Sequence, residues 1–314
     1  MALAASAAAA VAVGVAVVQS DAAETAAAPE RPQGAPPLLL ELGVRDDPEA
    51  LELRRAERLW ADGEHDEARA VFARHDSPEA RIGAALALWP DGAVPALRRI
   101  VVEHPGRADA RLNLGFALFW SGRREEAVEA WRKARRVQPD SLAAVRAGDL
   151  LFPQYARGLP VFVPSFEPPR DLQGLPDREQ LERLRAAAAA GGVREKLLYG
   201  VALQRIGRPL SARAQYDRAA AVAPAGDPEP LVAAAVARFD KASPDAAFSR
   251  LGPLARRFGD APTVRFHLGL LLLWIGEVED ARRQLTLARR ADPAHPLARE
   301  AERFLDRLED VETR

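Results

Sequence analysis

Apolar and small residues recur at helical spacing along most of this chain, and one pattern of them occurs three times without gaps. The three copies span residues 108–141, 193–226 and 262–295, and they share nine positions. In each copy, apolar residues three or four apart mark one face of a helix, and a second helix of this kind follows a glycine. The pattern therefore predicts three pairs of antiparallel helices joined by tight turns.

Small residues occupy the positions where the two helices of a pair must approach each other closely. These positions are Gly115, Gly200 and Gly269 in the first helices and Ala127, Ala212 and Ala281 in the second helices. Further glycines allow the tight turns, and prolines end the second helices because proline cannot continue a helix. The turn and end positions are Gly122, Gly207, Gly276, Pro139, Pro224 and Pro293.

The repeated pattern resembles the tetratricopeptide repeat family, whose unit is a helix–turn–helix of about 34 residues. The family's first-helix tryptophan and tyrosine are absent. Their positions hold Arg111, Lys196 and Arg265, and Leu118, Leu203 and Leu272. Variation of this kind is usual in the family, so the resemblance still implies the family's fold.

Weaker copies fill the gaps between the three clear repeats. Shortened repeats start near residues 49 and 78, and an intermediate repeat covers residues 231–259. Residues 142–192 hold one more repeat, interrupted by an insertion at residues 153–176. The two helices of that repeat are expected at residues 141–152 and 177–190.

A last amphipathic helix is expected at residues 296–308, where it closes the exposed end of the array. Its apolar face carries Leu297, Ala301, Phe304 and Leu305. The predicted fold class is all-α. The resemblance implies a right-handed α-solenoid of about seven tetratricopeptide-like helix–turn–helix repeats over residues 49–314, with a C-terminal capping helix.

The N-terminal part of the chain differs from the repeats. Residues 1–18 contain no charged side chain and consist mostly of alanine and valine. Eighteen helical residues would span about 27 Å, close to the thickness of a bilayer core. We expect residues 1–19 to be a signal peptide or membrane anchor, with an Ala-rich tail as the alternative. Residues 20–48 are expected to form a Pro/Ala-rich linker.

The composition excludes several classes of function. The chain has 44 basic and 45 acidic residues and a net charge of −1, which argues against a nucleic-acid binder. Cysteine is absent, which excludes a catalytic thiol and a thiolate metal site. The five histidines, His267 among them, are scattered and are expected to be surface or capping side chains. No catalytic or phosphate-binding motif occurs. The sequence therefore predicts no enzyme, no cofactor and no metal.

The resemblance implies a partner-binding groove lined by first-helix residues that do not pack inside their own repeat. They are Leu112, Phe116, Phe119 and Trp120 in the first clear repeat, Leu197, Val201, Gln204 and Arg205 in the second, and Phe266, Leu270, Leu273 and Trp274 in the third. Such a groove suits an apolar or amphipathic segment. Only Asn113 and Arg205 resemble the family's carboxylate-binding residues. Alternatively, these residues pack between repeats or are covered by the chain itself.

The insertion is itself aromatic and rich in proline, with Tyr155, Phe162 and Phe166 as its main aromatic residues. Two hypotheses follow. The insertion is either a plug packed in the groove or an exposed recognition loop. Packing is favoured because exposed apolar patches of this size are uncommon on a monomer.

The expected function is that of a non-enzymatic adaptor or scaffold that binds an apolar or amphipathic protein segment in an envelope-associated complex. One alternative is a chaperone-like module that presents a client to a maturation enzyme, as anchored repeat proteins of cytochrome c biogenesis do. Another is a cytoplasmic regulator built from the same repeats. The expected partners are a protein or peptide segment and, through residues 1–18, a membrane. Nucleic acid is not expected.

Overall fold

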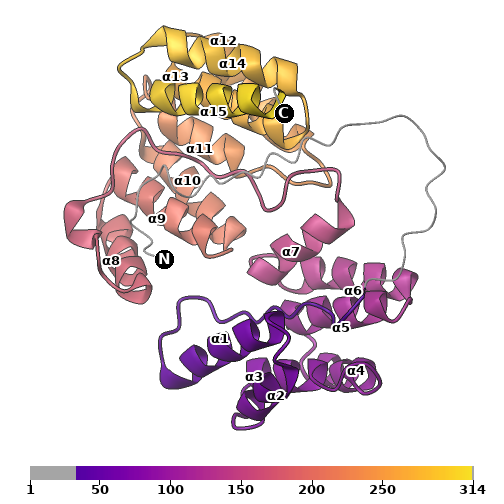
Figure 1. Ribbon diagram of the computed structural model, residues 1–314. Coiled ribbons are helices and arrows are strands. Elements are labelled where there is room, and N and C mark those ends of the chain that lie inside the picture. The colour runs from indigo at the N-terminus through magenta and orange to yellow at the C-terminus, as the bar shows by residue number, and fades with distance from the viewer. Residues whose placement is uncertain (1–32, 313–314) are drawn as a thin grey trace, which may run out of the picture. The chain divides into compact units, whose positions relative to one another are not determined.

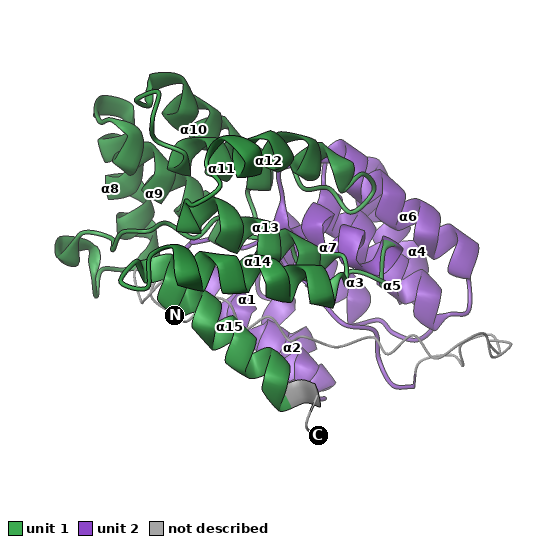
Figure 2. Cartoon of the chain, turned by 90° about the horizontal axis from the view of Figure 1, so that it is seen from above, with its two compact units in different colours: residues 1–18, 152–314 green, residues 19–151 purple. Residues whose placement is uncertain are grey.

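The computed structural model describes residues 33–312, and within this range it contains fifteen α-helices, one short 3-10 helix and no strand. The chain divides into two compact units, drawn in different colours in Figure 2. Among the described residues, unit 2 comprises residues 33–151 and unit 1 comprises residues 152–312. Each unit is described by itself below.

Unit 2 consists of three helix pairs and a single helix. They are α1 (Pro48–Ala61) and α2 (His65–Phe72), α3 (Pro78–Leu86) and α4 (Ala93–Glu103), α5 (Ala108–Trp120) and α6 (Arg124–Val137), and then α7 (Leu142–Leu151). Asp47 caps α1 by accepting a hydrogen bond from the Ala50 amide at 3.0 Å, and Ser77 caps α3 in the same way. These caps satisfy N–H groups that have no partner in the first turn of a helix.

Unit 1 begins with the insertion and continues with a single helix, three helix pairs and a last helix. They are η1 (Arg170–Leu172), α8 (Asp177–Ala190), α9 (Val193–Arg205) and α10 (Pro209–Val222), α11 (Glu229–Val236) and α12 (Asp245–Arg257), α13 (Pro262–Trp274) and α14 (Val278–Ala291), and α15 (Pro296–Glu312). All are labelled by number in Figure 1 except the short η1.

The first helices of successive pairs pack side by side in each unit. In unit 2 this first-helix layer consists of α1, α3, α5 and α7, and in unit 1 it consists of α9, α11, α13 and α15. In every pair the first helix also packs on the second. The expected all-α fold of helix–turn–helix repeats is confirmed, and α15 packs on α13 and α14 as the expected last helix.

The turns of the three clear repeats have the backbone that the sequence pattern predicts. Gly122, Gly207 and Gly276 lie at φ of 78°, 77° and 85°, a left-handed conformation that side chains with a Cβ rarely adopt. Each turn follows the last residue of a first helix within two positions, so the second helix folds back directly on the first.

The small residues at the helix crossings are required by the side chains opposite them. A Cβ built on Gly115 would overlap the Trp131 indole, and one on Gly269 would lie 2.9 Å from Leu285 Cγ. Trp131 and Leu285 are buried on the second helices α6 and α14. The glycines therefore set how closely the two helices of a pair approach.

We expect Gly115→Ala to destabilise unit 2 by about 2 kcal/mol, because the added methyl group must displace the Trp131 indole inside a packed core. Urea unfolding of the full chain measures this change. Gly148→Ala on α7 is the matched control, since its Cβ would meet only the Arg135 Nε atom at 3.8 Å. That variant should be neutral or more stable by up to about 1 kcal/mol. Equal effects of the two substitutions would contradict the packing.

Two features differ from the expected arrangement. The helices expected at residues 141–152 and 177–190 are present as α7 and α8, but they fall in different units, with the insertion between them. In addition, residues 36–42 were expected to be part of the linker, but they pack against the helices of unit 2. The reason is that leucines replace alanine and acidic residues after Pro37 and supply apolar surface to bury.

The predicted anchor or signal peptide at residues 1–19 and most of the linker lie outside the described residues. Among residues 33–312, no helix is both long and apolar enough to cross a membrane.

Candidate functional site

A non-helical segment of residues 36–42, here called the leading segment, lies against α1 and α5 in unit 2. It belongs to the indigo part of the ribbon in Figure 1. Leu40 and Leu42 are buried, with 5% and 4% of their surfaces exposed. At the start of the segment, Trp60 Nε1 on α1 donates a hydrogen bond to the carbonyl oxygen of Pro36 at 2.8 Å.

Asn113 on α5 holds the middle of the leading segment with both ends of its side-chain amide. Its Oδ1 accepts from the Leu39 amide at 3.1 Å, and its Nδ2 donates to the Leu39 carbonyl at 2.7 Å. Nδ2 also donates to the carbonyl of Asp109 at 2.8 Å, which fixes the orientation of the amide. Glu57 accepts from the Leu40 amide at 2.7 Å, and burial raises the pKa of its carboxyl group. Helical side chains therefore bind main-chain atoms of the segment.

We expect Asn113→Leu to reduce the free energy of unfolding of unit 2 by about 1–3 kcal/mol, because it leaves two partly buried main-chain groups of Leu39 without a partner. Leucine is tolerated in a first helix here, since Leu198 occupies the equivalent repeat position. Urea unfolding gives the free energy, and hydrogen exchange at residues 36–42 should become faster. Arg132→Gln on the exposed side of α6 is the control and should change neither quantity. Unchanged exchange in Asn113→Leu would contradict the proposed contact.

In unit 1, residues 159–166 of the insertion lie against the first-helix layer. We call them the insertion segment, and they belong to the pink ribbon between α7 and α8 in Figure 1. Phe162 is 0% exposed. Its ring stacks on the His267 imidazole with centroids 5.0 Å apart and meets the Tyr216 ring edge-on at 5.6 Å. The middle of the insertion is therefore packed in unit 1, not exposed.

His267 on α13 is fully buried, so the expectation of a surface or capping side chain was wrong. Its Nε2 accepts from the Val163 amide at 2.9 Å, and its Nδ1 donates to the Thr263 carbonyl at 2.7 Å. These two contacts require the neutral imidazole with its proton on Nδ1. Burial lowers the pKa of His267 to about 4, so the ring is neutral at physiological pH.

Gln204 on α9 binds the insertion segment just before the residue that His267 holds. Its Oε1 accepts from the Phe162 amide at 3.2 Å and from the Tyr216 hydroxyl at 2.7 Å. Its Nε2 donates to the Pro160 carbonyl at 3.4 Å. As in unit 2, a helical side-chain amide engages both a donor and an acceptor of the segment's main chain.

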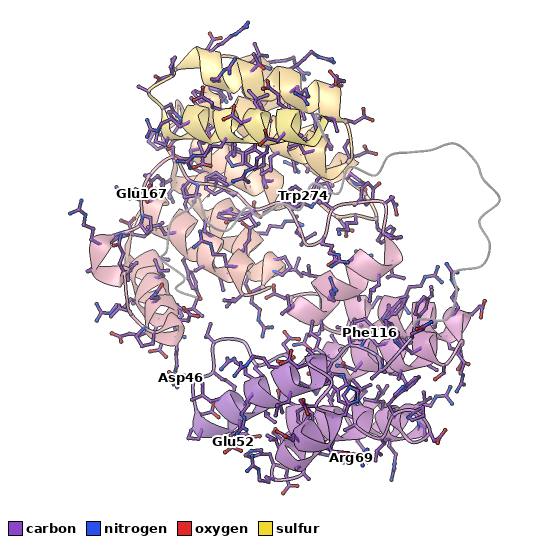
Figure 3. The ribbon with its side chains drawn as sticks, viewed as in Figure 1. Asp46, Glu52, Arg69, Phe116, Glu167 and Trp274 are labelled. Carbon is purple, nitrogen blue, oxygen red and sulfur yellow. The ribbon has the colours of Figure 1, made fainter. Side chains whose placement is uncertain are left out.

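The end of the insertion segment is held by charged side chains. Glu229 at the start of α11 accepts from the Ser165 amide and, at 2.8 Å, from the Ser165 hydroxyl. Burial raises the pKa of the Glu229 carboxyl group. Arg194 lies over the Phe166 ring, 4.6 Å from its centroid, and donates to the carbonyl of Glu167 at 2.8 Å. Glu167, labelled in Figure 3, marks where the segment leaves this surface.

The predicted groove residues all lie in the first-helix layers, and none of them is fully exposed. Seven are buried, namely Leu112, Phe116, Leu197, Val201, Phe266, Leu270 and Trp274. Five are half-buried, namely Phe119, Trp120, Gln204, Arg205 and Leu273, and so are Tyr155 and Phe166 of the insertion. Phe116 and Trp274 are labelled in Figure 3. Their role in partner binding stays a prediction.

Sequence reasoning did not assign Trp60, Glu57, Tyr216 and Glu229, nor the roles of Asn113 and His267 as acceptors for main-chain amides. One signal was available. Asn113 and His267 stand at the same position of two aligned repeats, among apolar neighbours that were expected to line the groove. A polar side chain at such a position needs a partner, and here the partner comes from a non-helical segment of the chain.

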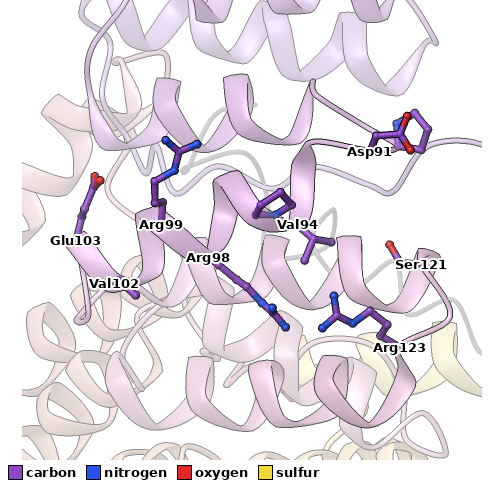
Figure 4. A pocket seen from close by; sticks show the side chains of 10 residues that line it. Asp91, Val94, Arg98, Arg99, Val102, Glu103, Ser121 and Arg123 are labelled. Atoms are coloured by element: carbon purple, nitrogen blue, oxygen red, sulfur yellow. The ribbon is translucent and has the colours of Figure 1, made fainter.

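One pocket of about 770 Å³ lies elsewhere in unit 2, between α4 and the turn that joins α5 to α6 (Figure 4). Its lining includes Val94, Arg98 and Arg123 and contains none of the predicted groove residues. Glu126 accepts from both arginines, at 2.6 Å from Arg98 and 2.7 Å from Arg123, which compensates part of their charge. Within residues 33–312, no group of three His, Asp or Glu side chains is arranged to hold a metal ion.

A comparison with known protein families identifies one match. Residues 90–148, which include α4, α5 and α6, match the family described as tetratricopeptide repeat. The match covers this part of unit 2 alone. No curated protein matches it.

Two solved structures match most of this chain, both with low TM-scores and distant sequences. Yeast Tom70 has a TM-score of 0.30 and 13% identity, with 85% of this chain and 56% of that chain covered. The APC/C hetero-tetramer Cut9–Hcn1 has a TM-score of 0.27 and 15% identity, with 82% of this chain and 55% of that chain covered. The present chain thus spans little more than half of either protein. Tetratricopeptide repeats stack into surfaces that bind other proteins.

Proposed function

We propose that this chain is a non-enzymatic scaffold whose first-helix layers bind non-helical, apolar segments of partner proteins. The observation that carries the proposal is the way each unit holds a segment of its own chain. In unit 2 the segment is bound by Asn113 and Glu57, and in unit 1 by Gln204, His267 and Glu229.

The chemistry of these contacts is general. The helical side chains bind amide and carbonyl groups of the main chain, which every protein segment carries. Side chains of a segment pack between the helices as well, as Phe162 does against Tyr216 and His267. Main-chain hydrogen bonds supply affinity in peptide recognition, and side-chain pockets supply selectivity. A groove built in this way is suited to binding polypeptide.

A peptide array tests the function. Labelled full-length protein is incubated with arrays of twelve-residue peptides, one set apolar with prolines and a second set polar, glycine-rich and uncharged. We expect binding to a subset of the apolar peptides, and we expect excess free peptide of residues 34–44 to compete with it. The scaffold function would be contradicted if neither set bound, or if binding were insensitive to the competitor.

We also propose that residues 1–18 hold the repeats at a membrane or direct their export, because they form an uncharged Ala/Val run ahead of a Pro-rich linker. Cell fractionation of the full chain and of a form starting at Pro29 tests this proposal. The full chain should be in the membrane or exported fraction and the shortened form should not. Identical distribution of both forms would contradict it.

A further inference from the structure

The two segments are bound in the same register relative to the repeats. Asn113 and His267 are equivalent positions, each two residues before a crossing glycine. Each accepts a main-chain N–H of its segment, and each donates to the carbonyl four residues earlier in its own helix. That second bond uses the donor end of the side chain and leaves the acceptor end facing the segment. The same pair of hydrogen bonds therefore occurs in both units, made by an asparagine in one and by a histidine in the other.

A proline stands three residues before the bound N–H in both segments. Pro36 precedes Leu39, and Pro160 precedes Val163. Both prolines are buried, and the carbonyl of each accepts a hydrogen bond from a first-helix side chain, Trp60 Nε1 for Pro36 and Gln204 Nε2 for Pro160. Proline fixes its own φ and disfavours helix in the residue before it, so it prepares the segment for main-chain contacts.

A carboxylate then binds the next available N–H group. In unit 2 it is Glu57, which accepts from Leu40 directly after Leu39. In unit 1 residue 164 is a proline with no N–H, and Glu229 accepts from Ser165 instead. Three contacts therefore occur in the same order in both units: a proline carbonyl, the amide of an apolar residue three positions later, and one further amide. Unit 1 adds the Phe162 amide, bound by Gln204, and unit 2 adds the Leu39 carbonyl, bound by Asn113.

We propose that the ligand of unit 2 is a segment with the pattern Pro-x-x-apolar, supplied by a partner protein in exchange for the leading segment. This inference rests on the proposed scaffold function and names its ligand class. The chain itself supplies the argument, because two sequences with little else in common, Pro36-Pro-Leu-Leu39 and Pro160-Val-Phe-Val163, satisfy the same contacts. The apolar residue must keep its N–H, since Asn113 accepts from it.

The leading segment is the one placed for exchange. Within residues 33–312 it joins a helix only at its C-terminal end, through residues 43–47 to α1. The insertion segment is connected to helices at both ends, α7 before it and α8 after it. A tethered segment competes with a free ligand at an effective concentration in the millimolar range, so weakening it raises the apparent affinity for a ligand in trans.

The test uses the full chain and a fluorescent peptide of residues 34–44. Leu39→Pro in the protein removes the N–H that Asn113 binds and leaves the groove side chains intact. We expect this variant to bind the peptide about tenfold more tightly than the wild type. Leu38→Pro is the control, because it also removes a half-buried leucine but leaves the bound amides of Leu39 and Leu40 in place, and it should gain much less affinity than Leu39→Pro. Adding Asn113→Leu to Leu39→Pro should abolish the gain.

Two changes in the peptide test the pattern itself. A peptide with Leu39→Pro should not bind, and a peptide with Pro36→Ala should bind about tenfold more weakly. If Leu39→Pro protein binds the Pro36→Ala peptide as tightly as the unchanged one, the Pro-x-x-apolar class is wrong while the scaffold function stands. If that protein binds none of the peptides and the array is also blank, both proposals fail.

A second measurement needs no variant. Hydrogen exchange of the leading segment in the wild-type chain should become faster when the unlabelled peptide is added in excess, because the peptide takes its place. Exchange of the insertion segment should not change. Unchanged exchange at residues 36–42 under saturating peptide would overturn the exchange proposal even if Leu39→Pro failed to fold.

Discussion

Replacing Phe162 with Ala is expected to destabilise unit 1 by about 3–5 kcal/mol, the largest effect of any single substitution in the insertion. The ring is fully buried, stacks on His267 and meets Tyr216 edge-on. Its removal deletes apolar contacts and leaves a cavity between α9, α10 and α13, the helices that hold the segment. Urea unfolding of the full chain, followed by circular dichroism, measures the loss.

Phe166→Ala is the matched control for this prediction. Phe166 is half-buried and packs under the Arg194 guanidinium at its outer face, so its loss should cost about 1 kcal/mol. The difference between the two substitutions is the informative quantity. If both variants melt like the wild type, the insertion does not pack in unit 1 and the exposed-loop hypothesis takes its place.

Unit 1 is expected to lose up to about 3 kcal/mol of stability through His267 as the pH falls from 6.5 towards 4. The pKa of His267 is lowered from 6.5 to about 4 in the folded chain, chiefly by burial. Between these two values the unfolded chain takes up a proton that the folded chain does not. The contribution is therefore fully present above pH 6.5 and is lost progressively on acidification.

His267→Asn isolates this effect. Asparagine at the equivalent position, Asn113, makes the same pair of contacts with a side chain that does not titrate, so the variant should keep the segment bound. Burial raises the pKa of Glu229 in both proteins, so its contribution to the pH dependence of the unfolding free energy cancels when the two are compared. The free energy of unfolding, measured from pH 7 to pH 4, should fall more steeply in the wild type than in the variant. If the unfolding free energy fell equally with pH in the wild type and in His267→Asn, His267 would not be a buried, neutral imidazole in the folded chain.

The repeats could be predicted from the sequence because their determinants are local. Gly115 and Trp131 are sixteen residues apart in one repeat, and the recurrence of the same interval in the other two repeats is enough to reveal their relation. The same holds for the turn glycines and the terminating prolines. The spacing of the clear repeats left room for one interrupted repeat at residues 142–192 and placed its second helix at residues 177–190, and the structure has α8 at Asp177–Ala190.

The bound segments could be predicted only in part, because their contacts join residues far apart in the chain. Leu39 and Asn113 are 74 positions apart, and Val163 and His267 are 104 apart. No periodicity links such pairs. The aromatic insertion drew attention through its composition, whereas the leading segment did not, because it follows directly on a stretch rich in proline and alanine that is typical of a linker. His267 was misplaced for the same reason, since its partner is a main-chain amide that leaves no mark in the sequence.

Hydrogen exchange resolved to single amides tests the central claim most directly, namely that each first-helix layer holds a non-helical segment by its main chain. The amides of Leu39 and Leu40 in unit 2 and of Phe162 and Val163 in unit 1 all donate to buried or half-buried side chains. They should exchange roughly a hundredfold more slowly than the amide of Glu167, which lies in an exposed residue. Exchange of all five amides at similar, unprotected rates would contradict the account.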